Sequence, residues 1–178
     1  MKILTPFLII AILTMSFISS DEWYQCETKN YKILFPKKPS ESSQIVNSAI
    51  GELTLNLNIY EVSENDTDDN LVYMVNETAY PETVINSDKK DLLDNFFRKS
   101  IDGAVNNVHG KLLSEKIMEL NKFPGREIRI DFQNGLAVIK MRMFLIKNRM
   151  FMIETITDTK KDFNKSINKF MDSFQLIN

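Results

Sequence analysis

Residues 140–154 read KMRMFLIKNRMFMIE, and this stretch decides what kind of sheet the chain builds. Apolar side chains dominate both halves of it, and the polar triplet at 147–149 separates the halves. A strand alternates its side chains between two faces, and two apolar strands joined by a short polar break form a hairpin. We therefore predict antiparallel strands at 136–146 and 150–157, covered on both faces.

The length of the hairpin loop determines which side chains share a face. If the loop after Ile146 holds two or four residues, odd positions before it share a face with even positions after it. That face collects four methionines and a single charge. Its members are Ile139, Met141, Met143, Leu145, Met150, Met152, Glu154 and Ile156. We expect this face to pack, dry, beneath the C-terminal helix.

The clustered methionines also allow a metal site as an alternative. The residues concerned are Met141, Met143, Met150 and Met152. Thioether sulfur selects Cu(I), but copper sites usually add histidine or cysteine, and His109 and Cys26 are remote in the sequence. Methionine also fills irregular core space because it is flexible and polarizable. We expect packing and keep copper handling as the alternative.

Residues 1–20, MKILTPFLIIAILTMSFISS, have the composition of a secretory signal peptide. One cation, Lys2, precedes an apolar run at 7–13, and small polar residues follow. A transmembrane helix needs about 20 apolar residues, whereas Pro6 and Thr14 bound a shorter run here. We predict cleavage after Ser20 and an exported chain, periplasmic or extracellular, with no stable membrane insertion after cleavage.

Residues 21–178 are expected to form a single domain, which is long enough to bury a core without disulfides. Cys26 is the only cysteine, so no internal disulfide can form, and a strand position in the core is its simplest role. The formal charge of −2 gives no excess of positive charge, which argues against nucleic-acid binding.

The rest of the chain alternates mainly with a period of two. Strands are predicted at 23–26, 31–35, 45–49, 53–60, 71–75, 112–120 and 128–132. Asn134-Gly135 predicts a hairpin turn, and residues 123–126, FPGR, fit an exposed type II turn. Helical spacing occurs at 88–105, with Ser87 or Asn86 as the cap, and at 158–174. The fold class predicted is α+β, an antiparallel sheet packed between α-helices.

Catalytic and metal motifs are absent from the sequence: it contains no HExxH, CxxC, GxGxxG, GxSxG or P-loop pattern. Any histidine-based catalysis would have to use His109, whose place after the first helix suits a contact with the helix dipole. A hydrolase using two of the 24 acidic residues stays open as an alternative, although nothing selects the pair. We predict a protein that is not an enzyme and needs no cofactor.

The order and wording of several segments resemble the small exported bacterial proteins of the PsbP/DcrB-like fold. The segments are YKILFPKKP at 31–39, NLNIY at 56–60, KFPGREIRIDF at 122–132, KNRMFMI at 147–153 and F-x-x-S-F at 170–174. The resemblance covers most of 23–177 in layout. It implies a PsbP-like sandwich with an antiparallel sheet between helices, and a non-enzymatic accessory or binding role.

These observations favour an exported binding or accessory protein of the cell envelope, with an unknown protein or small molecule as its partner. Loops carry recognition more often than cores do. The candidate binding residues are Phe123, Arg126 and Glu127 near the predicted turn, and Asp66 and Asp68 in the acidic loop 61–70. That loop offers oxygen ligands for calcium, but it lacks the glycine and final glutamate of an EF-hand, so we expect a solvated loop.

Overall fold

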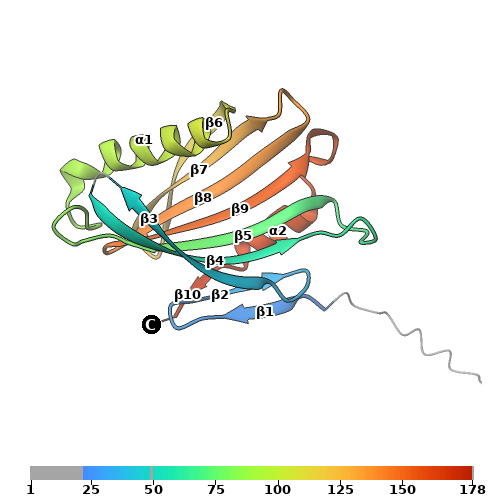
Figure 1. Cartoon of the computed structure of the whole chain (residues 1–178), viewed down its shortest axis with the longest axis horizontal. Helices are drawn as coiled ribbons and strands as arrows, with labels where there is room; N and C mark the ends of the chain where they lie inside the picture. Colours follow the sequence, from blue (N-terminus) through green and yellow to red (C-terminus); the bar gives the residue numbers. More distant parts are fainter. Residues whose placement is uncertain (1–21, 49, 178) are drawn as a thin grey trace, which may run out of the picture.

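The computed structural model describes residues 22–48 and 50–177 (Figure 1). The predicted signal peptide at 1–20 lies outside these residues. The strands are β1 (Tyr24–Glu27), β2 (Tyr31–Phe35), β3 (Ser40–Ser48), β4 (Gly51–Glu61), β5 (Asn70–Ala79), β6 (Lys111–Leu120), β7 (Phe123–Phe132), β8 (Ala137–Ile146), β9 (Arg149–Asp158) and β10 (Gln175–Leu176). The helices are α1 (Lys90–Asn107) and α2 (Lys165–Asp172), with a 3-10 turn at Thr159–Lys161. Within the described ranges, each helix is too short or too polar to cross a bilayer.

The strands form two antiparallel sheets. The large sheet has seven strands in the order β3-β4-β5-β9-β8-β7-β6, and the small sheet has the order β1-β2-β10. The prediction of an α+β sandwich, with one sheet between helices, is therefore wrong: the described chain is mostly β. The reason is that residues 24–35 form a separate sheet. This small sheet covers part of the face of the large sheet that the prediction assigned to a helix.

The central hairpin is confirmed in both extent and register. A two-residue loop, Lys147-Asn148, joins β8 to β9, and Lys147 has a positive φ of 52°. Met143 pairs with Met152, and Met141 pairs with Glu154. The even length of this loop brings the four methionines to one face of the sheet, as the parity argument predicted.

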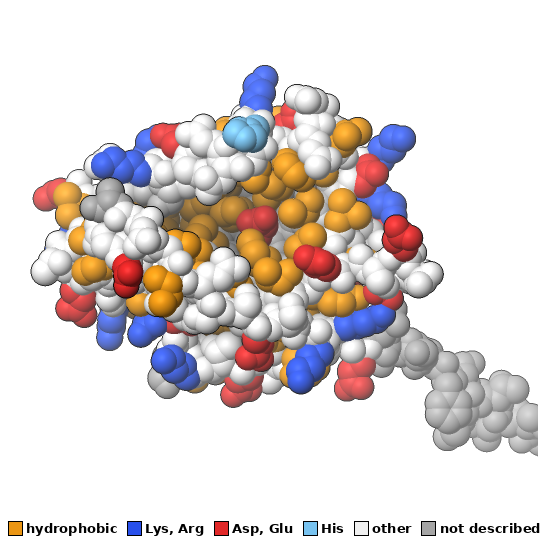
Figure 2. Space-filling view, viewed as in Figure 1, with side chains coloured by type: hydrophobic (Ala, Val, Ile, Leu, Met, Phe, Trp, Pro, Cys, Tyr) orange, Lys and Arg blue, Asp and Glu red, His pale blue; other side chains and the backbone are white. Residues whose placement is uncertain are grey.

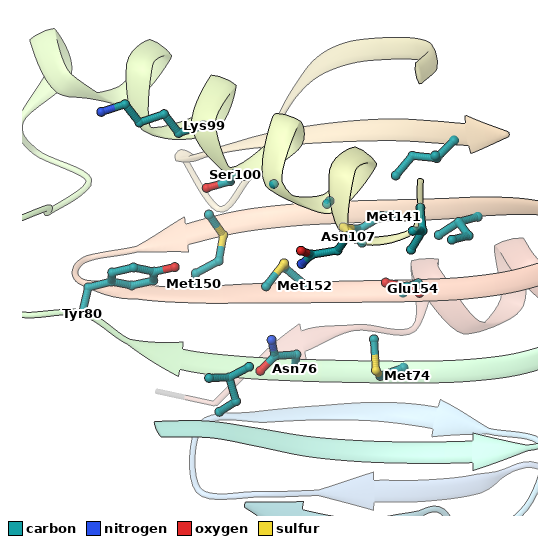
Figure 3. Close-up of a pocket in the computed structure, with 16 residues that line it drawn as sticks. Met74, Asn76, Tyr80, Lys99, Ser100, Asn107, Met141, Met150, Met152 and Glu154 are labelled. Atoms are coloured by element: carbon teal, nitrogen blue, oxygen red, sulfur yellow. The ribbon is translucent and has the colours of Figure 1, made fainter. Parts of the chain in front are cut away.

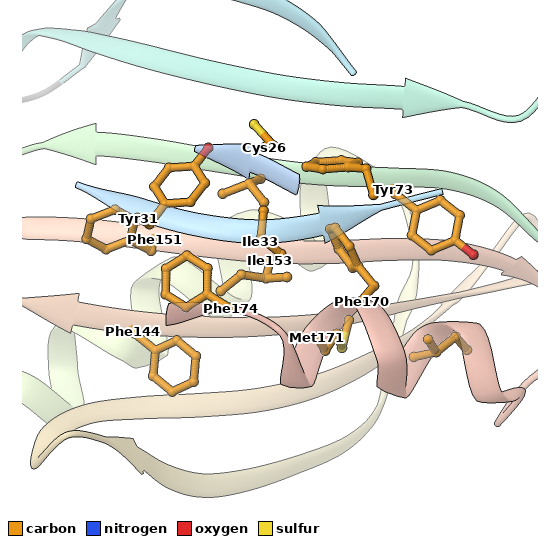
Figure 4. Packing of buried hydrophobic residues seen from close by; sticks show 13 residues of the cluster. Cys26, Tyr31, Ile33, Tyr73, Phe144, Phe151, Ile153, Phe170, Met171 and Phe174 are labelled. Atoms are coloured by element: carbon orange, nitrogen blue, oxygen red, sulfur yellow. The ribbon is translucent and has the colours of Figure 1, made fainter. Parts of the chain in front are cut away.

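One face of the large sheet, here called the α2 face, is covered by the small sheet and α2 (Figure 4). Aromatic rings interlock across this layer. Phe170 from α2 lies 5.0 Å from Phe35 and 5.1 Å from Tyr73, measured between ring centroids. Phe174 lies 5.7 Å from Phe151 on β9. Burial of these large rings holds the small sheet and α2 against the large sheet.

The opposite face, here called the α1 face, carries the methionines. Phe97 and Ile101 of α1 are fully buried against a cluster that includes Ile128 and Met143. Figure 1 shows α1 lying along the β6-β7-β8 side of the sheet. The helix above the methionines is thus α1, and the prediction that the C-terminal helix covers them is wrong.

The C-terminal helix is shorter than predicted. Phe163 adopts a left-handed φ of 64° and separates the 3-10 turn from α2, whose first turn is capped by the side chain of Asn164. Phe163 is 70% exposed, and the Arg129 guanidinium lies 4.3 Å from its ring centre. The predicted cap of α1 is also wrong: Lys89 precedes the helix without a side-chain cap, and the Ser87 hydroxyl accepts from the Lys147 amide instead.

The predicted turn at 123–126 is wrong as well. The turn lies at Asn121-Lys122, where φ is 50° and 70°, and Phe123 already begins β7. Gly125 serves packing: an added Cβ would approach Phe144 Cδ1 to 2.5 Å. The glycine is therefore needed for the close approach of the Phe144 ring rather than for a turn.

Candidate functional site

A pocket of about 410 Å³ opens between α1 and the large sheet. Figure 2 shows this side of the molecule hollowed, with hydrophobic side chains lining the hollow and an acidic group inside it. The apolar lining consists of Leu55, Met74, Ala104, Val108, Ile130, Ile139, Met141, Met150 and Met152. The polar or small members are Asn76, Tyr80, Lys99, Ser100, Gly103, Asn107 and Glu154.

The pocket exists because α1 covers only part of the apolar sheet. The helix packs mainly against β7, while the half-buried side chains of Leu55, Met74 and Met152 on β4, β5 and β9 face the open part. On the helix side, Gly103 and Ala104 are too small to fill the gap. A Cβ added at Gly103 would have no neighbour within 4 Å. Small residues on the helix opposite an uncovered apolar sheet therefore form the cavity.

Methionines supply much of the pocket wall (Figure 3). Met141, Met150 and Met152 line it together with Met74, whereas Met143 is fully buried beneath α1. The expected dry packing is thus found only in part. In Figure 3 the sulfur atoms are spread along the pocket and do not converge on one point, which is unlike the gathered thioethers of a copper site.

The residues that would complete a metal site lie elsewhere. Cys26 is buried on β1 with its Sγ 3.7 Å from Asn58 Oδ1, and burial raises the pKa of its thiol. His109 is exposed just after α1, with a φ of 49°. Among residues 22–48 and 50–177, no group of three or more histidine, cysteine or acidic side chains is placed to hold a metal ion.

Glu154 is the only carboxylate in the pocket lining. It lies on β9 between Met141 on β8 and Met74 on β5, its register partners (Figure 3). The residue is only 8% exposed, and burial raises the pKa of its carboxyl group to about 7. No hydrogen-bond donor or cation of the described residues reaches the carboxylate, and buried acids are ordinarily paired. Since the lining holds one acid, this pocket offers no carboxylate pair for hydrolysis.

The remaining polar groups occupy other parts of the lining. Tyr80 and Lys99 lie at the end of the pocket away from Glu154 (Figure 3). Burial raises the pKa of the Tyr80 hydroxyl. Asn76 is buried on β5, and its Oδ1 accepts from the Thr78 hydroxyl at 3.3 Å. In Figure 3 the labelled lining residues extend from Tyr80 to Glu154, with Asn76, Asn107 and Met152 between them.

The candidate residues near the predicted turn lie on both faces of β7 and outside the lining of the pocket. Arg126 is buried under α1, where it donates to Asp94 at 2.7 Å. Glu127 points to the opposite face and accepts from Arg142 at 2.7 Å. Phe123 is half-buried at the start of β7. Alternation along the strand places Arg126 on the face opposite to Phe123 and Glu127, and Arg126 and Glu127 each pair with a side chain of their own chain.

The candidates in the acidic loop bind their own chain. Asp66 accepts from the Tyr60 hydroxyl at 2.6 Å and pairs with Lys37. The hydrogen bond from Lys37, followed by that from Tyr60, lowers the pKa of Asp66 to about 2. Asp68 accepts from the Tyr73 hydroxyl at 2.7 Å. These contacts hold the loop against the fold, where Asp66 and Asp68 line a second hollow of about 380 Å³ that shares no residue with the pocket beneath α1.

The sequence held two signals for the pocket. Glu154 was the one charge on an otherwise apolar face, and a charge in that position is costly unless something pairs with it. Gly103-Ala104 placed two small residues side by side within the predicted helix at 88–105. Neither signal shows which helix lies above which face, so the pocket itself was missed.

Comparison with known proteins adds no identification. No protein-family model matches the chain, and no curated protein matches it. The resemblance to the PsbP/DcrB-like family stays a prediction, and the fold it implied is not the one observed.

Proposed function

We propose that the protein binds an elongated apolar small molecule in the pocket between α1 and the large sheet. The observation that carries this proposal is the uncovered apolar hollow of about 410 Å³. Ligand sites are typically concave, largely apolar clefts of about 300 to 1,000 Å³ with a few polar groups. The pocket has that size and that composition.

The character of the lining supports binding rather than packing. Protein interiors are close-packed, with few voids larger than a water molecule. Here Met74 and Met152 remain half-buried on an apolar surface that no described segment covers. A ligand that removed this surface from water would gain about 25 cal/mol for each Å² buried. Flexible thioethers adjust to the shape of such a ligand.

A small molecule fits the site better than a protein partner does. The hollow is concave and narrow, whereas protein interfaces are broad and bury about 800 Å² on each partner. The signal peptide predicted at 1–20 supports a location outside the cytoplasm. Sequencing the N-terminus of the mature protein tests that location.

Closing the pocket with a large side chain tests the binding proposal. Gly103 faces open space in α1, so a phenylalanine there has room without displacing the core. We expect wild type to bind the neutral fluorophore Nile red, and Gly103→Phe to weaken that binding at least tenfold. Fluorescence titration gives both dissociation constants.

Gly103→Ala is the matched control. Alanine adds one methyl group and raises helix propensity by about 1 kcal/mol, so this variant should keep its affinity for Nile red and unfold at a slightly higher temperature. If wild type fails to bind Nile red, or if Gly103→Phe binds it as tightly as Gly103→Ala does, the pocket is not the binding site.

A further inference from the structure

We propose that the ligand of this pocket carries a protonated amine, which Glu154 binds while the methionine lining holds the apolar body. This inference rests on the proposed function and deepens it by naming the chemical class of the ligand. The class is an alkylamine-like cation: one ammonium group at the end of an apolar chain or ring system.

The Glu154 carboxylate is isolated from the donors and cations of the described chain. It is 8% exposed, no residue within 22–48 and 50–177 forms a hydrogen bond or ion pair with it, and its oxygens keep a small contact with the solvent of the pocket. Its neighbours on the adjacent strands are the thioethers of Met74 and Met141, which donate nothing. A buried carboxylate without a donor is costly unless a partner arrives from outside the chain. An ammonium group brings a positive charge and several N–H donors in one small head.

The other ionisable groups of the pocket lining lie away from Glu154. Towards the C-terminal end of α1 the pocket is lined by Ala104, Asn107 and Val108, and none of these is charged. Lys99 and Tyr80 are the other ionisable groups of the lining, and Figure 3 places them towards the far end. Lys99 is exposed to solvent, so its charge is screened. The Glu154 end of the pocket therefore repels a carboxylate and attracts an ammonium group.

The lining residues between Glu154 and Tyr80 also suit an amine with a long apolar chain. Met150 and Met152 precede Glu154 on the same face of β9, so they extend an apolar track from the acid towards Tyr80. An alkyl chain whose amine contacts Glu154 would lie along these thioethers. The Asn107 amide lies above the track on α1 and can contact the same chain from the other side.

Ionisation supports the pairing over a definite pH range. Burial raises the pKa of Glu154 to about 7, whereas an alkylamine, like the lysine side chain, loses its proton near pH 10.4. Between these values both partners are charged. Amine binding should therefore tighten between pH 6 and pH 8, while binding of an uncharged alcohol of the same length should not.

The test compares three ligands of one chain length. Decylamine, decanol and decanoate are titrated into the purified protein at pH 8, and calorimetry measures each dissociation constant. We expect decylamine to bind about tenfold or more tightly than decanol, the size expected of a hydrogen-bonded charge pair, and decanoate to bind most weakly. Because calorimetry detects binding directly, the result does not depend on Nile red.

Two variants assign the preference to one side chain. In Glu154→Gln the ratio of decylamine to decanol affinity should fall close to one. In Glu119→Gln, which removes the same charge from the exposed part of β6 outside the pocket lining, the ratio should stay at its wild-type value. An amide in place of an unpaired buried carboxylate should not impair folding, because it removes the cost of burying a charge.

The outcomes separate the two proposals. Equal affinity for decylamine and decanol, tighter binding of decanoate, or an unchanged ratio in Glu154→Gln overturns the amine inference, and the pocket then remains a site for apolar molecules. If none of the three ligands binds and Nile red does not bind either, the proposed function fails and the inference fails with it.

Discussion

The two faces of the large sheet are covered to different extents, and the difference separates stability from binding. On the α2 face, the small sheet and α2 bury a layer of aromatic rings, and the hollow of about 420 Å³ beside Tyr31 is lined mainly by polar side chains. On the α1 face, one helix buries Phe97 and Ile101 but leaves a hollow of about 410 Å³ beside them. A face that is filled by the chain itself stabilises the fold, whereas a face that is half covered retains apolar surface for a ligand.

Two buried glutamates, one on each face, differ in whether the chain supplies a partner for the carboxylate. Glu77 is 5% exposed on the α2 face, where it accepts from Arg149 at 2.7 Å and from Asn30 at 2.6 Å. Glu154 is buried to a similar extent on the α1 face but has no such partner in the described chain. The first carboxylate is satisfied within the fold. The second has no partner in the described chain, and under the amine proposal a ligand would supply the cation.

The largest expected effect comes from removing a ring on the filled face. Phe170→Ala deletes a fully buried side chain that contacts Phe35 and Tyr73, so the unfolding free energy should fall by about 3 to 5 kcal/mol. Met152→Ala on the half-covered face should cost only about 1 kcal/mol, because that side chain already borders a cavity. Denaturant unfolding measures the unfolding free energy of both variants. Equal losses would show that the two faces contribute equally to stability.

A pH-dependent effect should follow from Glu154. Its pKa is raised from 4.5 to about 7 in the folded protein, so folding favours the protonated form. This contribution to stability is fully present below about pH 4.5 and is lost as the pH rises through 7. Glu154→Gln should thus be more stable than wild type by about 3 kcal/mol at pH 8, and about equally stable at pH 4. Denaturant unfolding at both pH values measures this difference. The same difference between Glu154→Gln and wild type at pH 4 and at pH 8 would contradict an unpaired buried acid.

The smallest effect, opposite in sign, is expected at Glu77. Glu77→Gln weakens the pair with Arg149, whose side chain is partly exposed, so the variant should lose about 1 kcal/mol at pH 8. Glu61→Gln, at an exposed position on β4, serves as the control and should change stability by less than about 0.5 kcal/mol. Denaturant unfolding measures both, and a stabilised Glu77→Gln would remove the contrast with Glu154.

Local patterns were enough to predict the central part of the fold. Alternating apolar residues and the short polar break identified β8 and β9 to within about one residue at each end, and the loop parity gave their shared face. The helix predicted at 88–105 is found as α1. These features depend on interactions between near neighbours in the chain, so the sequence carries them directly.

Features that depend on distant contacts were predicted poorly. The glycine of FPGR suits a turn by composition, but Gly125 lies in β7 because the Phe144 ring packs against its backbone. Phe163 matches a helical stripe, yet it leaves the core and stacks on Arg129. The candidate acids Asp66 and Asp68 were chosen as loop residues, and only the structure shows that Lys37, Tyr60 and Tyr73 contact them.

The sequence by itself determined the hairpin, the gathering of methionines on one face and the single acid among them, because strand alternation needs only local geometry. Only the tertiary structure decided that α1 rather than the C-terminal helix lies above that face, and that it leaves a pocket lined by Glu154 between itself and the sheet. Which layer packs on which face depends on contacts between residues far apart in the chain, and a pocket is the space those contacts leave unfilled.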